Sequence, residues 1–268
     1  GADILRDWVT ASDYAEDLRI DKSILNQHAE SYRKIRNTFR FILGNIQDNF
    51  QKIDIKSLNI KELPELERYI LHKIFILDLN YKENLKNYNF HKLYKELLNF
   101  CTLDLSSFYF DIRKDVLYCD SINSKKRKNC IIVLNILLDC LLKWFAPILV
   151  FTTEEIYNLV EKSETSIHEM QLPELKSEFQ DINLEKKWKN LYKIKREANV
   201  AIEEKRSTKE IGSSLEADIE IYTNEENYKL LEQLDLCEYF ITSRAHLSKN
   251  IDNEKGTIIK VKKANGKK

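Results

Sequence analysis

The segment SYRKIRNTFRFILGN, from Ser31 to Asn45, sets the architecture of this chain. Its apolar residues recur at steps of three and four, which is the spacing of one buried stripe along a helix. This stripe consists of Tyr32, Ile35, Phe39, Ile42 and, one position beyond the segment, Ile46. The same steps place four polar residues on another face, namely Arg33, Arg36, Asn37 and Arg40. We therefore expect a helix that packs into a core and presents three guanidinium groups and an amide together.

This polar face has three possible roles. Guanidinium groups donate hydrogen bonds in pairs and stay charged, so three of them in register suit phosphates and base edges. The simplest alternative is the solvated basic face of an ordinary amphipathic helix. In a third role, one or two of the arginines pair with buried carboxylates and only hold helices together. The segment alone leaves these roles open.

The composition predicts a mainly helical, globular chain. Its 268 residues suffice for one large domain or two smaller ones, and 43% of them are hydrophobic. Glycine occurs 5 times and proline 3 times, so few residues interrupt helices. The 43 basic residues balance the 43 acidic ones, which argues against a general polyanion binder. A local basic face can still bind a shaped RNA.

The sequence indicates a cytoplasmic protein with no membrane partner. No hydrophobic run approaches the roughly 18 to 20 residues that span a bilayer, and no secretory leader precedes the first helix. The cysteines are odd in number and lack CxxC spacing, so we expect reduced thiols and no metal site. They are Cys101, Cys119, Cys130, Cys140 and Cys237. With no initiating methionine, we expect the chain to begin inside a longer protein.

Further periodic segments predict a helical bundle up to about residue 180. Expected helices follow Pro64 and span Phe90–Cys101, Leu105–Leu117, Cys130–Phe145 and Thr153–Glu161. We expect Asp104 to cap the third of these helices, and Thr152 with Glu155 to form a capping box for the last. Asp111, Arg113, Lys114 and Asp115 are interpreted as a solvated, mutually paired face. The basic run from Ser124 to Lys128 is expected in a loop.

After residue 180 the pattern predicts a small α/β module. A long helix over Asn183–Arg206 should bury Leu184, Trp188, Leu191, Ala198 and Ile202. Another face of this helix carries basic residues at steps of three and four, which are Lys186, Lys189, Lys193 and Arg196. Gly212 is expected to turn the chain into a strand. Strands are predicted over Ile219–Thr223, Tyr239–Thr242 and Thr257–Val261.

Several of these segments resemble one known family. The GADILRDWV and DY residues of Gly1–Tyr14, the YRKIRNT-RF-LGN helix, Leu66–Ile74, Tyr88–Tyr118 and the IGSSLEA residues Ile211–Ala217 all match patterns of isoleucyl-tRNA synthetases. The resemblance extends from Gly1 to about Leu247. It lacks the cysteine-rich zinc module in which many bacterial members end.

The resemblance implies a three-part organisation and an RNA partner. Residues 1–28 would connect to a catalytic domain, 29–180 would form the helical anticodon-binding bundle, and 181–268 would add a long helix and a small α/β module. The parent enzyme would be a monomeric isoleucine–tRNA ligase that uses ATP and magnesium. This chain would bind tRNA(Ile) and attach to the catalytic and editing domains. The expected RNA-binding residues are Arg33, Arg36, Asn37, Arg40, Lys189, Lys193 and Arg196.

No residue is predicted to be catalytic in this chain. Cys101 has His91 ten positions upstream but no setting that would stabilise a developing oxyanion. The sequence contains no glycine-rich phosphate loop, nucleophile elbow or zinc-spaced cysteine set, and neither a HIGH-like nor a KMSKS-like motif. We therefore expect no cofactor in this chain and no aminoacylation by it alone. The alternatives are the same domain of a valyl- or leucyl-tRNA synthetase, or an all-α protein-interaction scaffold with no RNA role.

Overall fold

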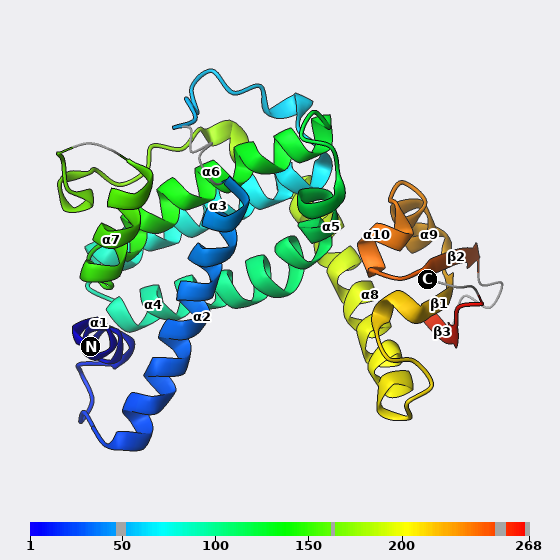
Figure 1. Ribbon diagram of the computed structural model, residues 1–268, viewed down its shortest axis with the longest axis horizontal. Helices are drawn as coiled ribbons and strands as arrows, with labels where there is room; N and C mark the ends of the chain where they lie inside the picture. The colour runs from blue at the N-terminus through cyan, green and yellow to red at the C-terminus, as the bar shows by residue number, and fades with distance from the viewer. Residues whose placement is uncertain (47–51, 162–163, 250–255, 266–268) are drawn as a thin grey trace. The chain divides into compact units, whose positions relative to one another are not determined.

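The computed structural model describes residues 1–46, 52–161, 164–249 and 256–265 (Figure 1). The chain divides into two compact units, Gly1–Asp181 and Ile182–Lys268. The first unit is helical and the second combines helices with a small sheet. This confirms the predicted fold class, which is a mainly α chain with a helical bundle followed by a small α/β module.

The first unit is built from seven α-helices and one π-helical segment among its described residues. In chain order these are α1 (Ala2–Ala11), α2 (Lys22–Ile46), α3 (Glu65–Lys86), α4 (Phe90–Asn99), η3 (Phe100–Phe110), α5 (Asp111–Cys119), α6 (Lys125–Phe145) and α7 (Val150–Val160). Helix α6 is the centre of the bundle, since it contacts α2, α3, α5 and α7 and most of its side chains are buried. Its central position confirms the prediction for Cys130–Phe145.

Helix α1 is fastened to the bundle by polar groups. The Asp3 carboxylate accepts hydrogen bonds from the Thr152 backbone N–H at 2.9 Å and from the Thr152 hydroxyl at 2.6 Å, so it caps the first turn of α7. Arg6 donates to the carbonyls of Pro147 and Ile148, between α6 and α7. Asp7 is buried and lies 2.8 Å from Nδ1 of His28 on α2. Polar residues of α1 therefore face the bundle.

The second unit packs three helices against one three-stranded sheet. Its helices are α8 (Ile182–Ser207), α9 (Glu225–Leu231) and α10 (Leu236–Phe240). The strands are β1 (Ala217–Thr223), β2 (Arg244–Lys249) and β3 (Ile258–Lys263), in the spatial order β2-β1-β3. Strand β1 pairs in parallel with β2 and antiparallel with β3. Leu184, Trp188, Leu191, Ala198 and Ile202 of α8 are all buried, as the sequence predicted.

Several local predictions are wrong. Asp104 does not cap a helix, because α4, η3 and α5 follow one another without a break; its carboxylate lies 3.1 Å from Nζ of Lys73 instead. Helix α7 begins at Val150, and Thr152 inside it is bonded by Asp3 rather than by a capping box with Glu155. Residues 125–128 form the first turn of α6, because the Ser124 side chain accepts from the Arg127 N–H and caps that helix.

The predicted strand over Tyr239–Thr242 is also wrong. Asp235 caps helix α10 by accepting from the Glu238 N–H at 3.1 Å, so Tyr239 and Phe240 are helical. The helix ends where Ile241 adopts a left-handed backbone conformation, with φ of 58°. The second strand is β2, which follows that turn. Alternating apolar residues at Tyr239–Thr242 had suggested a strand, but the aspartate cap sets the conformation.

Candidate nucleic-acid interface

The polar face of α2 is exposed as the helical spacing requires. Ile35, Ile42 and Ile46 are 0% exposed and Phe39 is 1% exposed, which fixes the rotation of the helix about its axis. All four residues of the predicted RNA-binding face are consequently on the solvent side, namely Arg33, Arg36, Asn37 and Arg40. We call these four residues the α2 polar face. The sequence segment therefore presents its guanidinium groups outward.

The arginines of the α2 polar face differ in their partners. Arg33 pairs through Nη1 with Glu30, three residues before it on the same helix, and both side chains are more than half exposed. Within the described residues, neither Arg36 nor Arg40 has an ion-pair or hydrogen-bond partner. No buried carboxylate holds any of the three. Arg36 and Arg40 are thus available to an anionic ligand.

An exposed aromatic side chain lies close to α2. The Phe41 ring stacks on Phe110 with ring centroids 4.2 Å apart, and the Tyr118 ring meets Phe41 edge-on at 6.3 Å. Tyr118 itself is 63% exposed. An exposed ring beside a cationic face can stack on an unpaired base. Sequence reasoning missed Tyr118, because only the packing of α5 against α2 reveals that it is exposed there.

The buried arginine of this unit is a different residue. Arg113 is 4% exposed and donates from Nε and Nη2 to the two oxygens of Glu67, each at 2.7 Å. Tyr109 and Cys130 also point at Oε1 of Glu67, at 3.3 and 3.2 Å. Burial lowers the pKa of Arg113, but the Glu67 carboxylate raises it by more, so the guanidinium stays charged. The interpretation of Arg113 as part of a solvated face is wrong.

Helix α8 carries the second predicted basic face. Lys189, Lys193 and Arg196 are all exposed, and Lys189 lies 3.6 Å from Glu185 one turn earlier. The next cation, Lys195, is buried and donates to the carbonyl of Tyr239. It holds α8 to α10 and is closed to a ligand. The α2 polar face and the α8 residues belong to different units.

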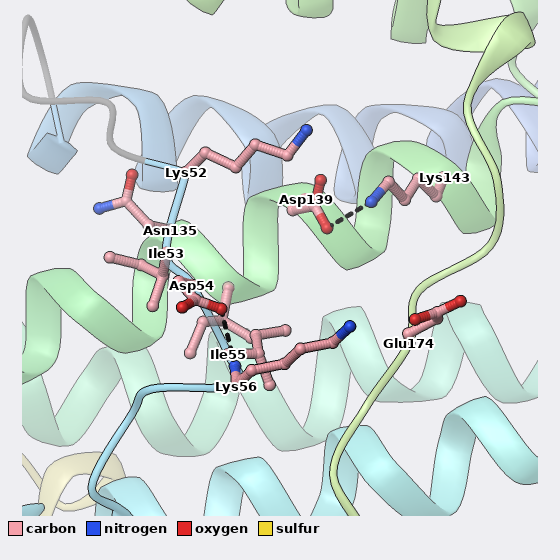
Figure 2. Close-up of a pocket in the computed structure, with 10 residues that line it drawn as sticks. Lys52, Ile53, Asp54, Ile55, Lys56, Asn135, Asp139, Lys143 and Glu174 are labelled. Carbon is pink, nitrogen blue, oxygen red and sulfur yellow. Dashed lines mark hydrogen bonds and ion pairs between the residues drawn. The ribbon is translucent and has the colours of Figure 1, made fainter.

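A cavity of about 390 Å³ opens between the segment 52–56 and helix α6 (Figure 2). The lysines Lys52 and Lys56 extend along it, and Lys143 pairs with Asp139 at 2.7 Å on its wall. The lining contains three lysines and three carboxylates; the carboxylates are Asp54, Asp139 and Glu174. Because these charges balance, the cavity has no net preference for an anion.

The described residues offer little for covalent or metal chemistry. Cys101 is 0% exposed, and burial raises its pKa to about 12, so its thiol is a poor nucleophile at neutral pH. Among the described residues, no three or more His, Cys, Asp or Glu side chains are grouped to hold a metal ion. No described helix is long and apolar enough to cross a membrane. The arrangement is that of a binding surface.

Comparisons with known proteins agree with this geometry. A family model described as "Anticodon-binding domain of tRNA ligase" matches residues 67–221. The isoleucine–tRNA ligase of Pelagibacter ubique is 59% identical over 268 residues, which cover 100% of this chain and 29% of that protein. The isoleucine–tRNA ligase of Agrobacterium fabrum is 43% identical over 218 residues, covering 81% of this chain and 22% of that protein.

A third relative, the isoleucine–tRNA ligase of Natranaerobius thermophilus, is 41% identical over 252 residues, which cover 93% of this chain and 27% of that protein. The chain thus spans less than a third of the length of the curated relatives that it matches. These relatives favour neither a valyl- or leucyl-tRNA synthetase nor a scaffold without an RNA role. The chain therefore belongs to the family of tRNA-ligase anticodon-binding domains, and its curated relatives are isoleucine–tRNA ligases.

Proposed function

We propose that this chain binds the anticodon arm of tRNA(Ile) through the α2 polar face and holds the tRNA for an isoleucine–tRNA ligase reaction. The observation that carries the proposal is the pair Arg36 and Arg40, which are exposed and without a described partner on a helix whose opposite side is buried. A solvated surface has no need of arginine there, in a chain where lysine is far commoner. Paired donation to phosphates or base edges does need it.

RNA loops are bound through unpaired bases stacked on aromatic or guanidinium planes, with Lys and Arg holding the phosphates. The first unit supplies both kinds of group, in Tyr118 and the α2 polar face. In the second unit we assign Lys189, Lys193 and Arg196 to further phosphate contacts. Which side chains read individual anticodon bases does not enter the proposal.

The chemistry itself is assigned to the rest of the protein. Activation of isoleucine would use ATP and magnesium, and the residues here do not fit that role, since the sequence has no phosphate-cradling loop. On α1, Leu5 and Val9 are 49% and 55% exposed beside the inward Asp3 and Asp7. We propose that the remaining catalytic and editing parts of a monomeric, cytoplasmic enzyme cover this outer face. The five cysteines are free, as the cytoplasm would keep them.

The test replaces the arginines of the α2 polar face one at a time. In Arg33→Ala, Arg36→Ala and Arg40→Ala we expect weaker binding of a tRNA(Ile) transcript to the 268-residue chain. Each lost phosphate contact should lower the slope of log affinity against log salt by about 0.7 to 0.9. The melting temperature should change little, because exposed substitutions usually alter stability by less than about 0.5 kcal/mol.

Lys34→Ala is the matched control. Lys34 is exposed on the same helix but points roughly 100° away from Arg33, since consecutive helical residues are that far apart. We expect its affinity and salt slope to match those of the unchanged chain. The proposal fails if the three arginine variants also keep both quantities, or if Lys34→Ala loses as much affinity as they do.

A further inference from the structure

The three-stranded sheet of the second unit has one buried and one open face. On the buried face, Ile219 and Ile221 of β1 are 0% exposed. They pair in register with Ala245 and Leu247 of β2 and with Val261 and Ile259 of β3. Helix α8 contacts β3, and α9 and α10 contact β2. This face is the apolar core of the unit.

Directly paired residues of neighbouring strands point to the same side, so the register also gives the composition of the other face. Strand β1 contributes Asp218, Glu220 and Tyr222. Their neighbours on β2 are Arg244, His246 and Ser248, and their neighbours on β3 are Lys262, Lys260 and Ile258. Arg244, His246, Ser248, Lys260 and Lys262 are exposed. We call these nine residues the open sheet face.

An aromatic ring and a mobile cation meet on the open sheet face. Nζ of Lys260 lies 5.1 Å from the centre of the Tyr222 ring, and the Tyr222 hydroxyl donates to Glu220 at 3.1 Å. The hydrogen bond fixes the ring, whereas Lys260 is exposed and has no carboxylate within ion-pair distance among the described residues. The ring can therefore accept another planar group when Lys260 moves aside.

The charges of the open sheet face leave two cations uncompensated. Glu220 pairs with Lys262 at 2.6 Å, and Asp218 lies 3.3 Å from His246. These contacts use both carboxylates. Arg244 donates only to the neutral carbonyl of Asn265, at 3.2 Å, and Lys260 rests on the Tyr222 ring. Arg244 and Lys260 thus flank the aromatic row with positive charge on an open, pleated surface.

We propose that the open sheet face binds an unpaired segment of RNA, with one base stacked on Tyr222 and backbone phosphates held by Lys260 and Arg244. Every base has a π-face, so stacking on an aromatic side chain tolerates sequence, while cations along the groove follow the backbone. Residues two apart on one strand are roughly 6.6 Å apart. The rows of Arg244 and Tyr222 are then separated by about twice that distance, which an extended RNA strand spans.

This inference rests on the proposed RNA-binding function but uses a surface that the α2 polar face does not include. A duplex would not serve this face, because its bases are already stacked on one another and closed to the Tyr222 ring. The two proposals therefore predict different ligands. A structured anticodon arm should depend on Arg36 and Arg40, and an unstructured single strand should depend on Tyr222.

The experiment measures binding of fluorescein-labelled oligouridine to the 268-residue chain, with a tRNA(Ile) transcript as the second ligand. We expect Tyr222→Ala to weaken oligouridine binding roughly tenfold, the effect of about one lost stacking contact. Tyr222→Phe keeps the ring and should bind within about twofold of the unchanged chain. Lys260→Gln and Arg244→Gln should each lower the salt slope by about 0.7, the value for one phosphate of a single strand.

Tyr228→Ala is the matched control. Tyr228 on α9 is half-buried and also carries a lysine over its ring, since Nζ of Lys249 lies 4.8 Å from the ring centre, but it is not part of the open sheet face. We expect it to leave oligouridine binding unchanged. Melting of each variant shows whether it folds, and the two Gln variants test the surface even if Tyr222→Ala unfolds.

The outcomes separate the two proposals. The open sheet face is refuted if the chain binds tRNA(Ile) but not oligouridine, or if Tyr222→Ala binds oligouridine as tightly as the unchanged chain does. It is also refuted if Tyr228→Ala loses as much affinity as Tyr222→Ala. If the chain binds neither RNA, the proposed function fails together with it. Selective loss in Tyr222→Ala, with rescue in Tyr222→Phe, supports the open sheet face.

Discussion

At the scale of single residues, this chain uses arginine in two opposite ways. Arg36 and Arg40 are exposed and without a described partner, whereas Arg113 is enclosed with Glu67 in a bidentate pair. An exposed guanidinium contributes little to stability and is free to bind a ligand. A buried one is held by its carboxylate, and removing either partner leaves an uncompensated charge in the core. The same residue type therefore predicts different mutant behaviour at the two places.

For Arg113→Ala we expect a loss of about 3–5 kcal/mol in the free energy of unfolding, because the Glu67 carboxylate stays buried without its partner. Denaturant unfolding measures this loss. The double variant Glu67→Met, Arg113→Met removes both charges and should recover most of it. A loss below about 1 kcal/mol for Arg113→Ala would place the pair with ordinary surface ion pairs and contradict this account.

At the scale of helices, α1 shows how polar groups can attach an element to a bundle. Asp3, Arg6 and Asp7 all point inward and satisfy groups on α2 and α7 and on the turn before α7. Of these, Asp7 is 0% exposed. Burial raises the pKa of Asp7, and Tyr94 and His28 lower it by less. The packing of α1 is therefore coupled to protonation of this carboxyl group.

The raised pKa of Asp7 predicts a stability that falls as pH rises. In the unfolded chain Asp7 loses its proton near the ordinary value of 3.8, whereas the folded chain keeps it to higher pH. Between these two values the folded state binds more protons, so the free energy of unfolding decreases with pH. This contribution is complete below the ordinary value and is lost once pH has passed the folded value.

Comparison with Asp7→Asn isolates that effect, because asparagine does not titrate. From about pH 3.5 to about pH 6 we expect the melting temperature of the unchanged chain to fall relative to that of Asp7→Asn. Glu16→Gln, at an exposed carboxylate near α1, is the control and should show no such trend. A constant difference between the unchanged chain and Asp7→Asn across this range would mean that Asp7 has an ordinary pKa.

The segment from α4 to α5 shows a limit of local patterns. Periodicity separated two helices at Asp104, but Phe100–Phe110 is π-helical and joins them. Phe100, Leu105 and Phe110 are all buried, a spacing of five that a π-helix places on one side and an α-helix does not. The Ser107 hydroxyl donates to the carbonyl of Thr102 five residues earlier, at 2.9 Å. Packing against α2 and α3 selects this geometry, which no three- or four-residue template can predict.

At the scale of the whole molecule, each of the two units has an apolar core of its own. Residues such as Ile70 are fully buried in the first unit, and residues such as Ile221 are fully buried in the second. A unit with its own core can open without the other, so local stability should differ along the chain. Destabilising one core then need not unfold the other.

We therefore expect Ile221→Ala to raise hydrogen exchange in residues 182–268 while leaving residues 1–181 protected, since a buried Ile→Ala costs about 2–5 kcal/mol. Ile70→Ala is the reciprocal variant and should expose only the first unit. Hydrogen exchange followed by mass spectrometry reads both units in one experiment. Equal acceleration in both units for either variant would show a single cooperative unit instead.

Features that depend on residues close in sequence could be predicted without the structure. The rotation of α2 follows from the spacing of Ile35, Phe39 and Ile42, and that spacing alone turns Arg36 and Arg40 outward. The buried side of α8 and the mainly α fold follow in the same way. The assignment to a family came from segments that match it residue by residue. In each case the cause lies within a few helical turns.

Features that depend on distant residues needed the folded chain. The partner of Arg113 is Glu67, on another helix, and the side chain that holds Thr152 is Asp3, at the other end of the unit. Likewise Tyr222 gains its neighbours Arg244 and Lys260 only through strand pairing. Burial, ion pairing and strand register are set by contacts across the fold, and one local pattern is compatible with several of them.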